Sequence, residues 1–254
     1  MIPLKDTVPR KNPPIAVWTI ILINALVFIF ELTLSEYQLV QLFYHFGLVP
    51  ARYTHPQWAM LVGLPVDTYF PYLTSMFLHG GWLHIIANMW ALWIFGDNVE
   101  DRMGPVRFTI FYLLCGFAAG VVHTLTNATS TIPTVGASGA IAGVMGAYLV
   151  LYPRARIVVL LPIFFIPWFF ELPAVLYIGF WALTQFFSGA LALAGPSDVG
   201  GVAWWAHAGG FTAGIFLQFF FVRPPRDYRR AARDEYGRGF ETAWVPTAYW
   251  RGFR

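Results

Sequence analysis

Six apolar runs constrain this chain more than any other feature, because each is about as long as a lipid bilayer is thick. A helix that crosses a membrane needs about 20 consecutive, mostly apolar residues. Of the 254 residues, 57% are hydrophobic and 11% are charged, which excludes an ordinary soluble domain. We therefore predict an all-α fold, a polytopic membrane helical bundle with six transmembrane helices. The runs lie near residues 15–34, 83–99, 106–125, 135–152, 172–193 and 204–222.

Two further stretches are apolar but are divided by prolines. Residues 35–81 contain many aromatic side chains and four prolines, which favours amphipathic pieces that lie in the membrane interface. Residues 157–170, "IVVLLPIFFIPWFF", contain two prolines and are followed by Glu171. We interpret this second stretch as an interfacial connection, and a seventh span is the competing interpretation.

Basic residues favour the six-span scheme, because loops on the cytoplasmic side carry an excess of lysine and arginine. With the N-terminus inside, a single basic residue, Arg52, falls outside, whereas a seventh span would place the arginine-rich C-terminal end outside. We expect a cytoplasmic N-terminal segment (residues 1–14), a membrane domain (15–222) and a basic cytoplasmic tail (223–254). We predict that this is a multi-pass protein of a bacterial plasma membrane. Its surroundings would be the lipid bilayer, and it would have no nucleic-acid partner.

Four polar side chains within these runs are candidates for a functional site: His84, Asn88, Ser138 and His207. Polar groups within a membrane are costly and usually functional. Ser138 and His207 each lie 16 residues before the arginine that follows their run. That is about 24 Å at the helical rise of about 1.5 Å per residue, and Asn88 lies at about 20 Å by the same rise. The sequence therefore predicts one polar layer on three helices, several ångströms below the outer surface.

Small residues explain how two of these helices could meet. Gly139-x-x-x-Gly143 and Gly210-x-x-x-Gly214 allow the close approach of helix backbones within a membrane. If these two faces meet, the serine and the histidine of the sixth run come within hydrogen-bond reach. The alternative is that the glycines only pack helices and the serine only bonds a backbone carbonyl group.

A serine beside a histidine is a pair of nucleophile and base. The tetrahedral intermediate of acyl transfer also needs hydrogen-bond donors for its oxyanion. His84 and Asn88 are four residues apart and share a helix face, so they could supply donors together with the Ser138 N–H. No carboxylate lies at this depth to orient His207, which predicts a dyad.

Other chemistries fit the sequence less well. An aspartyl protease needs two carboxylates within the membrane, and a zinc protease would contain His-Glu-x-x-His, which is absent. His79 and His84 are five residues apart, about 140° around a helix, which does not suit joint binding of zinc with His207. An ion or proton carrier would usually show carboxylates in its path. We therefore expect neither a metal nor a cofactor.

Over residues 18–222 the chain resembles the rhomboid family of intramembrane serine proteases. Four motifs carry the resemblance: "HGGWLHIIAN" at His79, "GDNVEDRMG" at Gly96, "GASG" at Gly136 and "AHAGGFTAG" at Ala206. The resemblance implies that the fifth span and the loop of residues 194–203 form a gate for substrates. It also assigns roles to individual residues: Ser138 as nucleophile, His207 as base, His84, Asn88 and the Ser138 N–H as oxyanion donors, and His79, Gly136, Gly139 and Gly210 as supporting residues.

Two positions depart from the family pattern. Many members carry an aromatic residue four positions after the nucleophile, which stacks on the histidine, whereas this chain has Ala142. Many also carry a Trp-Arg pair in the first loop, where this chain has Phe70 and Pro71. Both positions support the site and are not reacting groups.

The predicted function is that of an intramembrane serine endopeptidase. It would cleave single-span membrane proteins near the outer leaflet, within transmembrane segments that unwind easily. An inactive rhomboid-like protein that binds transmembrane segments without cutting them is the main alternative.

Overall fold

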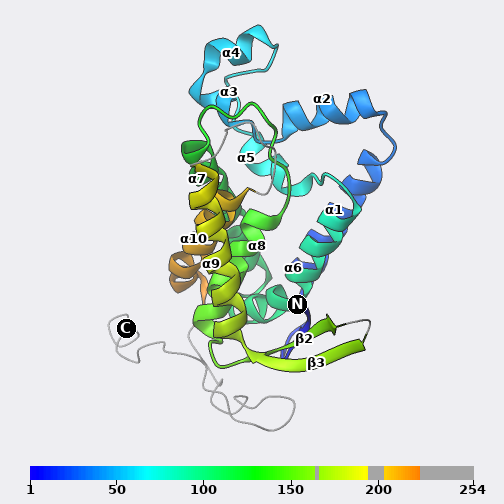
Figure 1. Ribbon diagram of the computed structural model, residues 1–254, viewed down its shortest axis with the longest axis vertical. Helices are drawn as coiled ribbons and strands as arrows, with labels where there is room; N and C mark the ends of the chain where they lie inside the picture. Colours follow the sequence, from blue (N-terminus) through cyan, green and yellow to red (C-terminus); the bar gives the residue numbers. More distant parts are fainter. Residues whose placement is uncertain (164–165, 194–202, 224–254) are drawn as a thin grey trace.

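The computed structural model describes residues 1–163, 166–193 and 203–223 (Figure 1). Most of this part is helical, and each predicted apolar run coincides with a helix to within a few residues. Residues 194–202 of the predicted gate loop and 224–254 of the predicted tail lie outside the described residues. The long helices are α1 (Ile15–Glu31), α6 (Trp82–Met103), α7 (Pro105–Thr126), α8 (Ser138–Leu151), α9 (Ala174–Leu193) and α10 (Trp204–Phe221).

The stretch between α1 and α6 consists of short helices at one end of the molecule (Figure 1). Three of them begin with a proline in the first turn, where its missing N–H has no helical partner to lose. Three of the four prolines that interrupt this stretch in the sequence therefore start helices, and Pro71 starts the last of them. The elements are α2 (Glu36–Phe46), α3 (Pro50–Thr54), α4 (Pro56–Leu61), α5 (Pro71–Thr74) and the 3₁₀-helix η1 (Ser75–Phe77).

Arg52 holds this stretch together. Its side chain is buried, and it donates from Nε to the carbonyl oxygen of Pro65 at 2.5 Å and from Nη1 to that of His45 at 3.1 Å. A buried guanidinium that bonds two backbone carbonyls joins the segments before and after α3 and α4. From the sequence, Arg52 indicated only the orientation of the chain in the membrane. Its role as a buried hydrogen-bond donor was not predicted.

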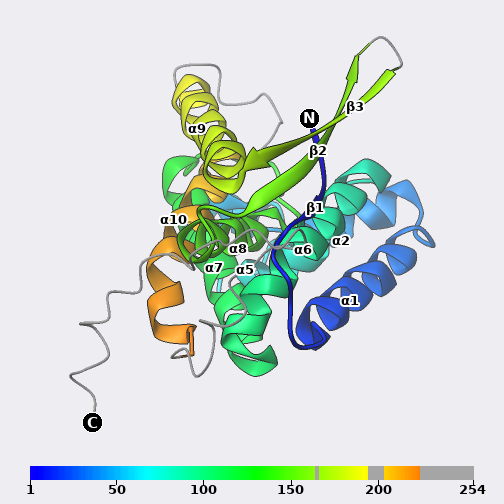
Figure 2. The same cartoon turned by 90° about the horizontal axis from the view of Figure 1, so that it is seen from below.

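A three-stranded antiparallel sheet lies at the opposite end of the molecule, so the prediction of an all-α fold is wrong in this detail (Figures 1 and 2). Its strands are β1 (Ile2–Asp6), β2 (Arg156–Ile163) and β3 (Ile166–Pro173), in the order β1-β2-β3. Within residues 157–170, the described part therefore lies in two paired antiparallel strands, so a seventh helical span is not formed, and the interfacial position of this stretch stays a prediction. The two prolines that divide the stretch pair with each other near the end of the β2–β3 ladder, where the loss of ladder hydrogen bonds costs least.

The N-terminal segment is anchored to the bundle by buried polar groups. Asp6 accepts a hydrogen bond from the Tyr148 hydroxyl of α8 at 2.5 Å. Burial raises the pKa of Asp6 to about 8, although the bond from Tyr148 acts in the opposite direction. Glu100 of α6 accepts the N–H groups of Ala16 and Val17, which are free donors in the first turn of α1.

Helix α8 lies at the centre of the bundle and packs most extensively on α10 and α7. Its contact with α10 is between backbones: a Cβ atom on Gly210 would overlap the carbonyl oxygen of Gly139, and one on Gly214 would overlap that of Gly143. Gly143 in turn lies against the carbonyl oxygen of Gly210. The predicted meeting of the two glycine faces is confirmed by this contact.

By length and apolar composition alone, two helices of the described residues could cross a membrane. They are Pro105–Thr126, which is α7, and Ala174–Ala192, which covers nearly all of α9. Ile15–Glu31 and Ser138–Leu151 are apolar but shorter. That six helices cross the membrane therefore stays a prediction.

Replacing Gly214 by alanine should destabilise the protein, because the new methyl group would overlap the backbone of Gly143. Overpacking of this kind typically costs about 1–3 kcal/mol, or several degrees of melting temperature in a domain of this size. Gly179→Ala on α9 is the matched control, since nothing lies within 4 Å of its new methyl group. Thermal melting of both purified variants in detergent is the measurement. Equal melting temperatures would contradict a tight α8–α10 contact.

Candidate active site

Ser138 and His207 lie side by side at the starts of the two helices that meet through glycine. Ser138 is the first residue of α8, and His207 lies in the first turn of α10. The His207 Nε2 atom is 2.8 Å from the Ser138 Oγ atom, which is a hydrogen bond. His207 is buried, whereas Ser138 is half-buried. The pair thus combines a base shielded from bulk water with a hydroxyl that a substrate could reach.

Gly136 determines how the chain enters α8. Its φ of 128° lies in the left-handed region that favours glycine, and its N–H donates to the Ser75 carbonyl at 2.8 Å. A Cβ atom here would lie 2.7 Å from His84 Nε2 and 3.6 Å from Asn88 Nδ2. Glycine therefore lets both side chains of α6 pack against the segment that leads into the nucleophile.

The donors needed for an oxyanion are present around this segment. Asn88 is buried, and its Nδ2 atom has no hydrogen-bond partner in the described part of the chain. A buried donor without a partner is costly, so its retention calls for an explanation such as a catalytic role. The Ser138 N–H belongs to the first helical residue, where no intrahelical acceptor exists. Both groups, with His84 beside Gly136, can donate to an anionic oxygen.

His79 lies closer to His84 than the sequence analysis predicted. That analysis placed both histidines on one helix, but α6 begins at Trp82, so helical spacing does not apply to His79. The two rings meet edge to face with their centroids 5.2 Å apart, and the His79 N–H donates to Glu31 at 3.1 Å. Among the described residues, no group of three or more metal-binding side chains is arranged to hold an ion.

Helix α9 supplies two neighbours of His207 that the sequence analysis missed. Gln185 places its Oε1 atom 2.7 Å from His207 Nδ1, so the base has a polar partner besides the serine. The Trp181 ring lies one turn earlier, with its centroid 5.9 Å from that of His207. The tryptophan supplies an aromatic ring beside the histidine, which the alanine at position 142 cannot supply. Their four-residue spacing on one helix was the available signal in the sequence, but a neutral glutamine does not stand out as a partner for the histidine in the way that a carboxylate would.

The arrangement is that of a helical bundle in which a half-buried serine contacts a buried histidine beside further hydrogen-bond donors. A family model described as "Rhomboid domain" matches residues 67–224, which include all of these groups. The chain therefore belongs to the rhomboid family and is a membrane protein.

Curated relatives agree with this membership. The chain is 33% identical over 163 residues to "RHOMBOID-like protein 1" of Arabidopsis thaliana, covering 61% of this chain and 35% of the relative. It is 26% identical over 170 residues to "Rhomboid protein 1, mitochondrial" of Saccharomyces cerevisiae, covering 65% and 46%. It is 34% identical over 101 residues to "Presenilin-associated rhomboid-like protein, mitochondrial" of Bos taurus, covering 37% and 26%. The matched region thus spans less than half the length of each of these relatives.

Substituting Gly136 by alanine should distort the site, since alanine is strained at this φ and its methyl group would press on His84. Backbone strain of this kind costs about 1–3 kcal/mol, which thermal melting in detergent would detect. Gly80→Ala is the control, because its methyl group would approach the same histidine only at 3.9 Å. An unchanged melting temperature for Gly136→Ala would show that the entry to α8 tolerates a side chain.

Proposed function

We propose that this protein is an intramembrane serine endopeptidase that cleaves transmembrane segments of single-span membrane proteins. The observation that carries the proposal is the 2.8 Å contact between His207 Nε2 and Ser138 Oγ. Membership of the rhomboid family and the donors around Gly136 support the same reaction.

In the proposed mechanism, Ser138 Oγ attacks the carbonyl carbon of the scissile peptide bond while His207 Nε2 accepts the hydroxyl proton. The carbonyl oxygen becomes an oxyanion that the Ser138 N–H, Asn88 and His84 stabilise. Collapse of the intermediate breaks the C–N bond, and His207 returns the proton to the leaving amine. Water then attacks the acyl-enzyme through the same base, which releases the acid and regenerates the serine. These steps require neither a metal nor a cofactor.

We further propose that α1, α6, α7, α8, α9 and α10 cross the membrane, with the N-terminus and the tail of residues 223–254 in the cytoplasm. The excess of basic residues on that side supports this orientation. It places the serine below the outer surface, where a polar layer admits water. Two of the relatives described above are named mitochondrial, so a bacterial plasma membrane stays a prediction.

A substrate helix must unwind before it reacts. Its peptide carbonyls are hydrogen-bonded to N–H groups four residues further on, so a nucleophile cannot reach them in an intact helix. Glycine and proline are the poorest helix formers and lower the cost of unwinding. The proposed substrates are therefore membrane-spanning segments that contain such residues near the outer leaflet.

A fluorophosphonate probe should label the purified protein at Ser138, because the probe reacts with serines activated by a neighbouring base. Ser138→Ala should lose both labelling and cleavage of a single-span reporter while keeping its melting temperature. His207→Ala should be nearly as severe, since residues that act as a unit are not additive. Ser188→Ala on α9 is a matched control that should keep full activity. A rhomboid-like protein that only binds transmembrane segments would not be labelled, and that result would overturn the proposal.

Asn88→Ala should lower turnover by about 100- to 1000-fold, the usual effect of losing one oxyanion donor. The Michaelis constant should change little, because the oxyanion exists only after attack. Steady-state cleavage of the reporter separates the two constants, and Asn12→Ala, an exposed asparagine of the N-terminal segment, is the control. A variant with raised Michaelis constant and normal turnover would instead identify Asn88 as a residue that binds the substrate.

A further inference from the structure

We propose that Gln185 of α9 positions His207 for catalysis, so that α9 takes part in the chemistry and not only in the entry of substrates. This inference rests on the proposed function, because it concerns how the base of that reaction is held. Its physical basis is the 2.7 Å contact between Gln185 Oε1 and His207 Nδ1.

The orientation of the Gln185 amide is fixed by its other hydrogen bonds. Its Nε2 atom lies 3.2 Å from the Trp181 carbonyl oxygen and 3.1 Å from Thr184 Oγ1, both of which can accept. The Thr184 hydroxyl donates its own proton to the same Trp181 carbonyl at 2.6 Å, so its oxygen is left as an acceptor for Gln185. These partners direct the amide nitrogen along α9 and leave the amide oxygen facing His207.

An amide oxygen can only accept a hydrogen bond, so His207 must carry a proton on Nδ1 to satisfy this contact. In the neutral ring, a proton on Nδ1 leaves the lone pair on Nε2. Nε2 is the atom that faces Ser138, so the glutamine selects the tautomer in which the histidine can act as a base. Gln185 is 5% exposed and His207 is 9% exposed, so water competes little for this bond.

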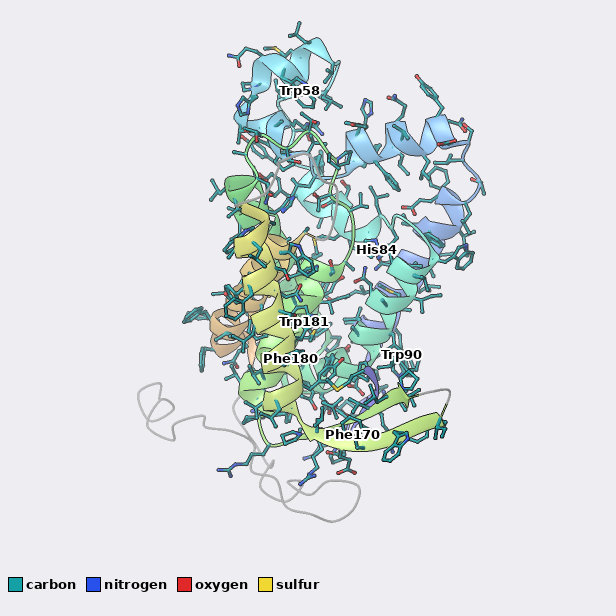
Figure 3. All side chains as sticks on the ribbon, viewed as in Figure 1. Trp58, His84, Trp90, Phe170, Phe180 and Trp181 are labelled. Atoms are coloured by element: carbon teal, nitrogen blue, oxygen red, sulfur yellow. The ribbon has the colours of Figure 1, made fainter. Side chains whose placement is uncertain are left out.

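Trp181 supports the same ring from the same face of α9. It precedes Gln185 by four residues, and this spacing places the two side chains next to each other on a helix. Its ring is inclined at 35° to that of His207 and also lies 6.1 Å from Phe211 of α10. Figure 3 shows Trp181 on α9, where the neighbouring Phe180 is exposed. One side of α9 thus fixes the orientation of the imidazole.

The test compares two variants of Gln185 in the purified full-length protein. Gln185→Met keeps the approximate shape of the side chain but removes the acceptor, and Gln185→Glu restores an acceptor. We expect the methionine variant to lose about 100-fold in turnover, the scale of effect when a catalytic group is misplaced by about 1 Å. The rate of fluorophosphonate labelling should fall in parallel, with little change in the Michaelis constant. The glutamate variant should recover most of both rates.

A matched control separates positioning from packing. Gln218→Met replaces another buried glutamine, on α10, and it should leave both rates near those of the parent. The melting temperature of each variant shows whether the protein is folded, and Gln185→Ala replaces Gln185→Met if the latter unfolds. Normal turnover in a folded variant without an acceptor would overturn this inference and leave the proposed function intact. A loss of turnover that glutamate does not restore would have the same meaning. If the parent protein is not labelled at Ser138, the proposed function fails, and the inference fails with it.

Discussion

The backbone contact between α8 and α10 is the constraint on which the rest of the site depends. Gly210 and Gly214 of α10 lie so close to the backbone of Gly139 and Gly143 of α8 that no side chain fits at either position of α10. Ser138 and His207 stand at the starts of these helices, so the distance between the backbones determines the distance between the two side chains. Helix α8 thereby holds the serine and α10 holds the histidine, and neither residue is held by a loop. Sites carried on packed helices keep their geometry better than sites carried on loops.

The groups around the reaction centre are uncharged when the base holds a single proton. Serine, histidine, glutamine and asparagine supply every hydrogen bond that we assign to the mechanism, and within the described part of the chain the hydrogen-bond partners of the histidine are Gln185 and Ser138. An ionised group is expensive in a membrane and in a low-dielectric interior, so a neutral amide is a cheaper partner for a buried imidazole. Charge then develops only during the reaction, where the donors near Gly136 can stabilise it. The Asn88 Nδ2 atom, which has no hydrogen-bond partner among the described residues, is one such donor.

The sequence predicts the helices and the contact between Ser138 and His207 well because small and polar residues stand out against a nearly uniform apolar background. The glycine spacings identified the meeting faces, and the count of residues to the nearest arginine placed Ser138 and His207 at one depth. The paired strands β2 and β3 could not be predicted in this way, since continuous apolar residues show neither a helical nor a strand period. Gln185 was missed for another reason: a neutral side chain on an apolar helix looks unremarkable until its partner is known.

The sheet pairs a strand near the N-terminus with a strand that is far along the chain. Strand β1 contains residues 2–6, but its partner β2 begins at Arg156, so about 150 residues must be synthesised before the ladder can form. Contacts of such long sequence separation form late, after local helices and their neighbours are in place. We therefore expect the pairing of β1 with β2 to form after the helices that lie between them in the sequence. We expect a segment added before Ile2 to slow the pairing of β1 with β2, even though it would lie far from the serine and the histidine.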